Sequence, residues 1–208
     1  MKKEAASALP TRARSTLDTE VRPADAGTRP VVWSIAGSDS GAGAGLQADL
    51  KALQAFGVHG CMAVAAITAQ NSVAVTRVEP VSAELLDAQL CALAQDMPPQ
   101  AIKTGLLGSA DNVRVVCQWV DRLRAQGQAV ALVVDPVLGS STGAAFANDA
   151  VRQAYVDELL PRATLITPNQ AEALRLGLAD SATQQALRAQ GVSLCITCLL
   201  YTSPSPRD

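Results

Sequence analysis

Aromatic side chains are scarce in this sequence. They make up 3% of its 208 residues, and 17 Lys and Arg are balanced by 19 Asp and Glu, for a formal net charge of −2. Surfaces that bind nucleic acid usually combine exposed aromatic rings with basic residues. The composition therefore argues against a nucleic-acid partner, and the charge balance gives no reason to expect binding to an anionic membrane.

Long hydrophobic runs are also missing. No stretch approaches the roughly 20 apolar residues that a membrane-spanning helix needs. Residues 1–30 are polar and rich in Ala, Thr, Arg and Pro, without the apolar segment of a secretory signal, so we interpret them as a disordered extension. The five cysteines lack a metal-finger arrangement, although Cys195 and Cys198 form one C-x-x-C. Buried thiols in a reducing compartment are the simplest interpretation, and they favour a cytoplasmic protein.

Histidine occurs once, at His59, so histidine-based acid–base catalysis has no support. What is abundant is hydrophobic sequence, at 49% of the chain. From residue 31 onward, short apolar runs alternate with amphipathic ones. They predict strands at 31–36, 61–68, 101–103, 129–134, 164–167 and 192–197. They predict helices at 45–56, around 86–93 after Ser82 as N-cap, at 113–127, at 149–160, and from Ser181, whose spacing to Gln184 suits a capping box.

Strands that alternate with helices indicate βαβ units. Such units build a mainly parallel sheet with helices on both faces, so the predicted fold class is α/β. Ligands of these folds bind beyond the carboxyl ends of the strands. The polar residues that follow each strand are therefore the candidate site residues.

A glycine-rich segment follows the first strand and precedes the first helix. Residues 36–45 contain four glycines and three alanines, which allow the backbone to approach a ligand closely. The segment does not match the Rossmann pattern, and no Gly-Lys-Ser/Thr of a Walker loop occurs in the chain. Asp39 in this segment and Asp49 in the helix are candidate acceptors for an amino or hydroxyl group. A flexible turn and a solvated helix residue are the alternatives.

Further polar residues follow the later strands. Gln70 offers a donor and an acceptor that suit a heteroaromatic ring. Asp135 follows a strongly apolar strand, and Asn169 and Glu172 share a face at a helix start. Oxygen ligands of this kind suit Mg²⁺, which enters with substrate phosphates. Asn169 as an N-cap with Glu172 as its capping-box partner is the alternative.

Taken together, these segments resemble the hydroxymethylpyrimidine/phosphomethylpyrimidine kinases of the ribokinase superfamily. The resemblance runs from about Val31 to Thr197, and its most specific parts are I-A-G-S-D-S-G-A-G-A-G-L-Q-A-D-L at 35–50 and I-T-P-N-Q-A-E at 166–172. Shorter matches are A-Q-N at 69–71, I-K-T-G-L-L at 102–107 and V-D-P-V at 134–137.

The resemblance implies a ribokinase-like three-layer α/β/α fold and phosphorylation, with ATP, of 4-amino-5-hydroxymethyl-2-methylpyrimidine and its monophosphate in thiamine biosynthesis. It implies a small-molecule pyrimidine partner, a cytoplasmic location and a possible homodimer. Gly37, Asp49 and Gln70 would hold the aminopyrimidine, and Leu106 and Val137 would line the pocket. Asn169 and Glu172, with Asp135 nearby, would organise Mg²⁺.

Relatives carry a later loop of the Gly-x-Gly-Asp or Gly-Thr-Gly-Cys type, which this sequence lacks. Since phosphoryl transfer depends on positioning and on electrostatic stabilisation of the transferred group, we expect this chain to be inactive or nearly so. We expect 31–197 to be the N-terminal portion of a kinase domain and the Pro-rich residues 198–208 to be a non-native tail. A pyridoxal or pyridoxine kinase and a non-catalytic pyrimidine-binding fragment are the alternative interpretations.

Overall fold

The computed structural model describes residues 29–139 and 147–197. Nearly all of the predicted N-terminal extension, the predicted non-native tail and Cys198 lie outside the described residues. None of the described helices is long and apolar enough to span a lipid bilayer.

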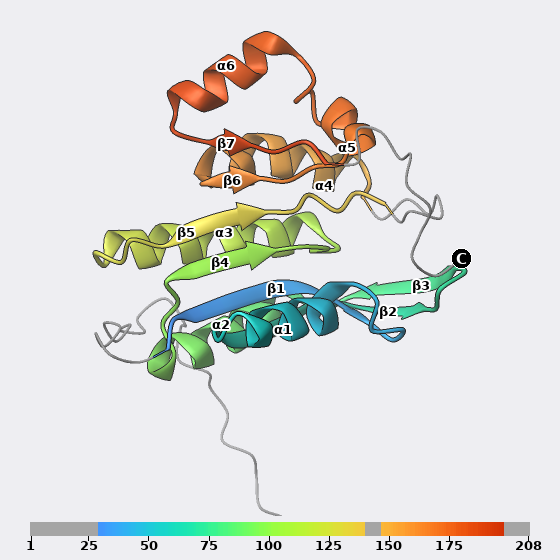
Figure 1. Ribbon diagram of the computed structural model, residues 1–208, viewed down its shortest axis with the longest axis vertical. Helices are drawn as coiled ribbons and strands as arrows, with labels where there is room; N and C mark the ends of the chain where they lie inside the picture. The colour runs from blue at the N-terminus through green and yellow to red at the C-terminus, as the bar shows by residue number, and fades with distance from the viewer. Residues whose placement is uncertain (1–28, 140–146, 198–208) are drawn as a thin grey trace, which may run out of the picture.

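A mainly parallel sheet organises the described part of the chain (Figure 1). Its seven strands lie in the order β3-β2-β1-β4-β5-β6-β7. Only the β2–β3 pair is antiparallel, so the predicted α/β class is confirmed. The strands are β1 (Val31–Asp39), β2 (His59–Gln70), β3 (Val75–Pro80), β4 (Ala101–Thr104), β5 (Ala131–Val134), β6 (Leu165–Ile166) and β7 (Ser193–Leu194).

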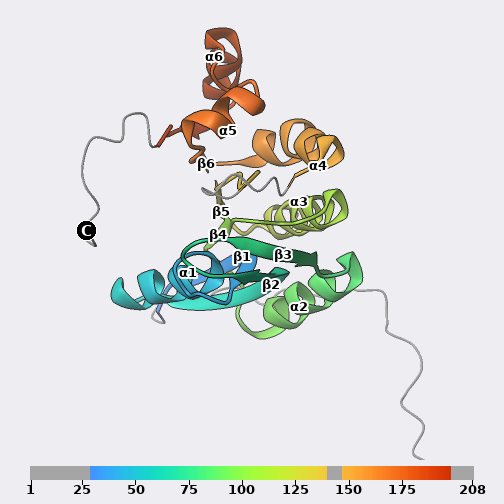
Figure 2. The same ribbon diagram turned by 90° about the vertical axis from the view of Figure 1, so that its right-hand side faces the viewer.

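Helices cover both faces of this sheet (Figure 2). Helix α1 lies on one face, and α2, α3 and α4 lie together on the other. The arrangement is the three-layer architecture that the alternating sequence pattern predicts. The helices are α1 (Gly45–Ala55), α2 (Ala83–Asp96), α3 (Ala110–Ala125), α4 (Asp149–Ala154), α5 (Gln170–Arg175) and α6 (Ser181–Ala189).

The core lies mainly between the sheet and α2, α3 and α4. Two tryptophans anchor it: Trp33 of β1 and Trp119 of α3 meet edge to face, with ring centroids 6.3 Å apart. Trp33 also donates to the carbonyl of Met97 at 2.8 Å, so its buried N–H group is satisfied. Along β4 and β5 the residues alternate between fully buried and half-buried. The half-buried positions therefore share one face of the sheet.

Four details differ from the sequence-based predictions. Strand β3 was not predicted. The predicted helix 149–160 stops being α-helical at Tyr155, where a π-helical turn and then a 3₁₀ turn follow. The N-cap of α6 is Asp180, which accepts from the N–H of Thr183, so the Ser181 capping box was wrong. Finally, buried thiols were predicted, but Cys195 is exposed. The described cysteines are free thiols, and Cys61 and Cys117 are buried as expected.

Candidate active site

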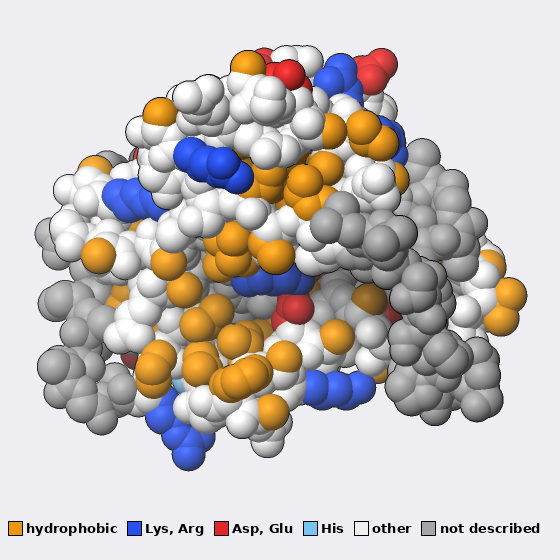
Figure 3. All heavy atoms as spheres, turned by 45° about the horizontal axis from the view of Figure 1, so that its top comes forward, with side chains coloured by type: hydrophobic (Ala, Val, Ile, Leu, Met, Phe, Trp, Pro, Cys, Tyr) orange, Lys and Arg blue, Asp and Glu red, His pale blue; other side chains and the backbone are white. Residues whose placement is uncertain are grey.

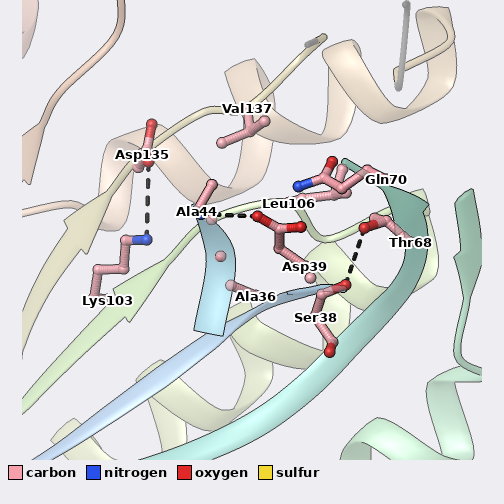
Figure 4. Close-up of a pocket in the computed structure, with 13 residues that line it drawn as sticks. Ala36, Ser38, Asp39, Ala44, Thr68, Gln70, Lys103, Leu106, Asp135 and Val137 are labelled. Atoms are coloured by element: carbon pink, nitrogen blue, oxygen red, sulfur yellow. Dashed lines mark hydrogen bonds and ion pairs between the residues drawn. The ribbon is translucent and has the colours of Figure 1, made fainter. Parts of the chain in front are cut away.

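A cavity of about 130 Å³ opens at the carboxyl ends of four adjacent strands. Figure 4 shows its side chains converging from the ends of β1, β2, β4 and β5. In the space-filling view, hydrophobic side chains surround a hollow in which basic and acidic groups lie together (Figure 3). The lining residues are Ala36, Gly37, Ser38, Asp39, Ala44, Gly45, Thr68, Gln70, Lys103, Gly105, Leu106, Asp135 and Val137.

The sequence-predicted residues divide into two groups in this structure. Six of them line the cavity: Gly37, Asp39, Gln70, Leu106, Asp135 and Val137. The other three do not line it. Asp49 lies behind Lys103 beside a second, smaller cavity, and Asn169 and Glu172 lie at the start of α5.

Asp39 holds the glycine-rich loop in its folded shape. One carboxylate oxygen accepts from the N–H of Gly41 at 2.7 Å, and the other accepts from Gly43 at 2.9 Å and Ala44 at 2.8 Å. Burial raises the pKa of Asp39, but hydrogen bonds from Gln70 and these three N–H groups outweigh it and hold the pKa below its ordinary value. The carboxylate therefore acts first as an internal acceptor for its own loop.

Two residues join this loop to its neighbours. Gln47 of α1 accepts from the N–H of Asp39 at 2.9 Å and donates to the hydroxyl of Ser38 at 2.7 Å. The hydroxyl of Ser40 donates to the carbonyl of Gln70 at 2.6 Å and accepts from the N–H of Gln70 at 2.9 Å. These bonds fix the start of the loop and hold the backbone of Gln70 beside it.

Close packing explains two of the glycines, against backbone at one and against a side chain at the other. Gly45 begins α1 with φ of +58°, and a Cβ there would collide with the carbonyl oxygen of Gly37. A Cβ on Gly37 would lie 3.1 Å from Cδ2 of Leu106. The cavity floor at Gly37 is thus bare backbone that faces an apolar side chain, which suits a flat ring.

Lys103 also lines the cavity, and no role was predicted for it from the sequence. Its ammonium group donates to both carboxylate oxygens of Asp49, at 3.0 and 2.8 Å, and lies 3.8 Å from Oδ2 of Asp135. Asp49 also accepts from the Ser34 hydroxyl at 2.6 Å. The signal in the sequence was a lysine inside an apolar four-residue strand, where a charged side chain needs a partner.

Asp135 lies in a partly desolvated environment beside this lysine. Burial raises the pKa of its carboxyl group, Lys103 lowers it and Asp49 raises it, and the net direction is upward. Next to it, the buried hydroxyl of Tyr155 donates to the carbonyl of Gly105 at 3.1 Å. This bond fixes the loop after β4, which carries Leu106 into the cavity.

Asn169 and Glu172 form the capping box of α5. The Asn169 side chain accepts from the N–H of Glu172 at 2.9 Å, and the Glu172 carboxylate accepts from the N–H of Asn169 at 2.9 Å. The alternative interpretation of these two residues is therefore the one the structure displays. Burial raises the pKa of Glu172, and two backbone N–H groups lower it without cancelling the rise. No cluster of three His, Cys, Asp or Glu suited to a metal occurs within 29–139 and 147–197.

Comparison with known proteins connects this geometry to a family. Residues 39–199 match the family described as phosphomethylpyrimidine kinase. The chain belongs to that family. It is 43% identical over 151 residues to the hydroxymethylpyrimidine/phosphomethylpyrimidine kinase of Synechococcus elongatus, a match that covers 73% of this chain and 56% of that protein.

Solved structures agree with the family assignment. The phosphomethylpyrimidine kinase of Clostridium difficile superimposes with a TM-score of 0.67 at 32% identity, covering 80% of this chain and 74% of that one. The pyridoxal kinase of Staphylococcus aureus in complex with pyridoxal gives a TM-score of 0.64 at 30% identity, covering 81% and 65%. These neighbours confirm the ribokinase-like kinase fold. The chain spans between 56% and 60% of the length of the two family relatives from Synechococcus elongatus and Rhizobium meliloti.

Proposed function

We propose that this chain carries the substrate cavity of a kinase that phosphorylates 4-amino-5-hydroxymethyl-2-methylpyrimidine and its monophosphate in thiamine biosynthesis, with ATP as the phosphoryl donor. The observation that carries the proposal is the cavity at the ends of β1, β2, β4 and β5. It combines an amide and bare backbone with apolar walls, in a member of the phosphomethylpyrimidine kinase family.

The cavity chemistry suits an aminopyrimidine. The Gln70 amide offers a donor and an acceptor, which match a ring nitrogen beside an amino group. Leu106 and Val137 provide apolar contact for the ring, and the bare backbone at Gly37 allows the ring to lie close. Asp49 does not line this cavity, so its proposed contribution is through Lys103 rather than through direct contact.

ATP and Mg²⁺ are proposed from the family. The pyridoxal kinase of Staphylococcus aureus in complex with AMP-PCP and pyridoxal has this fold. That complex supports a nucleoside triphosphate as the phosphoryl donor. The hard oxygen donors of Asp135, Asn169 and Glu172 suit Mg²⁺ held through water, because the direct contacts of Asn169 and Glu172 are already used in the capping box. Bound Mg²⁺ would supply charge stabilisation to the phosphates. Asp135, Asn169 and Glu172 would orient the waters of that ion.

A pyridoxal kinase remains the second candidate, because pyridoxal kinases are among the structural neighbours. Thermal unfolding of the 208-residue chain with each alcohol separates the two functions. A ligand at 100 times its dissociation constant stabilises the native state by about 2.7 kcal/mol, which raises Tm by roughly 5–10 °C for a domain of this size. We expect the larger rise with the pyrimidine alcohol. A larger rise with pyridoxal would overturn the assignment.

A further inference from the structure

Lys103 stands out among the residues that enclose the cavity. It is the one Lys, Arg or His among the described residues of the cavity lining. Its side chain projects from a half-buried position of β4 toward the face that carries α1. Figure 4 places Lys103 and Asp135 together at the opposite end of the cavity from Gln70. The charged groups of Lys103 and Asp135 therefore lie at one end of the cavity, and the amide group of Gln70 lies at the other.

The hydrogen bonds of Lys103 do not use up its capacity. An ammonium group carries three N–H donors, and the two oxygens of Asp49 account for two of them. Oδ2 of Asp135 lies 3.8 Å from the same nitrogen. Among the described residues, this is the one ion pair that the Asp135 side chain makes. The Asp135 side chain is 36% exposed. A carboxylate so exposed has several accessible rotamers, and an ion pair at this distance favours the rotamer that points toward the ammonium group.

Asp49 is not the one carboxylate near Lys103 in the described structure, because the same ammonium group also lies close to Asp135. Asp49 already accepts from the buried Ser34 hydroxyl, and it lines the smaller cavity rather than the larger one. Lys103 lines both. Its ammonium group therefore links a carboxylate behind the cavity to a carboxylate in the cavity wall.

We propose that Lys103 is a positioning residue of this site, whose ammonium group fixes the Asp135 carboxylate at the cavity wall while neutralising Asp49. The effect on ligand binding rests on the proposed function, whereas the effect on Asp135 does not. Lys103 acts through Asp135, and Asp135 lines the cavity. Ligand affinity then depends on the charge at position 103 as well as on the shape of the cavity.

A matched pair of variants isolates this role. Lys103→Met alone would leave the Asp49 carboxylate without its cation and lower stability for that reason. The comparison is therefore between Asp49→Asn and the double variant Asp49→Asn/Lys103→Met. Both carry a neutral residue 49, and Met keeps most of the length and apolar stem of the lysine. We expect the two proteins to unfold at similar temperatures.

Two measurements on this pair decide the proposal. The first uses no ligand: three-bond NMR couplings report the χ1 angle of Asp135. We expect a single rotamer in Asp49→Asn and averaging over rotamers in the double variant; a single rotamer in both would overturn the proposal. The second is calorimetric titration with the pyrimidine alcohol, for which we expect at least tenfold weaker binding in the double variant. Equal affinity would also overturn the proposal. If neither protein nor the wild type binds the alcohol, the proposed function fails and the couplings still decide the role of Lys103.

Discussion

Replacing Asp39 by alanine removes the acceptor of three backbone hydrogen bonds in the glycine-rich loop. A net hydrogen bond contributes about 1 kcal/mol, so three contribute about 3 kcal/mol. Because Gly41, Gly43 and Ala44 are exposed, their N–H groups regain water when the carboxylate is lost. We therefore expect the free energy of unfolding to fall by about 2 kcal/mol, measured by urea denaturation near neutral pH.

The pH dependence gives the same prediction a second test. The pKa of Asp39 is lower in the folded protein than its ordinary value. Its stabilising contribution is thus complete above about pH 4, the unfolded value, and is lost as pH falls through the lower folded pKa. Asp39→Asn keeps one acceptor oxygen and cannot titrate. The difference in stability between wild type and Asp39→Asn should shrink as the pH falls below 4.

The control is Asp96→Asn, which changes an exposed carboxylate at the end of α2. We expect it to alter the free energy of unfolding by less than about 0.5 kcal/mol. A loss below about 0.5 kcal/mol for Asp39→Ala would show that the loop does not depend on this carboxylate. A wild-type/Asn difference that stays constant down to pH 2 would refute the electrostatic part of the argument.

Two further substitutions test local features near the cavity. Ala42 adopts a positive φ of 56°. Ala42→Gly should raise the free energy of unfolding by about 0.5 kcal/mol, because relief of the strain of this left-handed conformation outweighs the greater freedom of glycine in the unfolded chain. A destabilised variant in urea denaturation would contradict this. Tyr155→Phe removes the donor to the buried Gly105 carbonyl and should cost about 1–2 kcal/mol. Unfolding at the wild-type urea midpoint would show that this bond is not needed.

Much of the fold could be predicted because its pattern is local. The strands that are buried on both faces are continuous apolar runs, and the helices between them show apolar residues at helical spacing. Strand β3 escaped prediction because it lies at the sheet edge, carries Thr76, Arg77 and Glu79 and ends in a proline. The N-cap of α6 was misplaced by one residue because Asp180 and Ser181 are both good N-cap residues.

The site was harder to predict than the fold. Residues that end or directly follow strands, such as Gln70 and Asp135, could be placed at the cavity from the topology alone. The direction in which a side chain points could not be predicted in this way. Asp49 lies on the sheet-facing side of α1, where its carboxylate forms an ion pair with Lys103. The two residues are 54 positions apart in the sequence, so local sequence does not reveal this contact. Local sequence also could not decide between a capping box and a metal site for Asn169 and Glu172, since both use the same oxygen atoms.

The central claim is that the cavity beside Gly37 binds the pyrimidine alcohol. Calorimetric titration of that alcohol into the wild-type chain and into Gly37→Val tests it directly. Valine suits a strand, but its side chain would enter the cavity against Leu106, whose Cδ2 lies 3.1 Å from a Cβ at this position. We predict one-to-one binding to the wild type and at least tenfold weaker binding to the variant, both measured at a temperature at which thermal unfolding shows the two proteins to be folded. Equal binding to both proteins, or no binding to the wild type, would contradict the account.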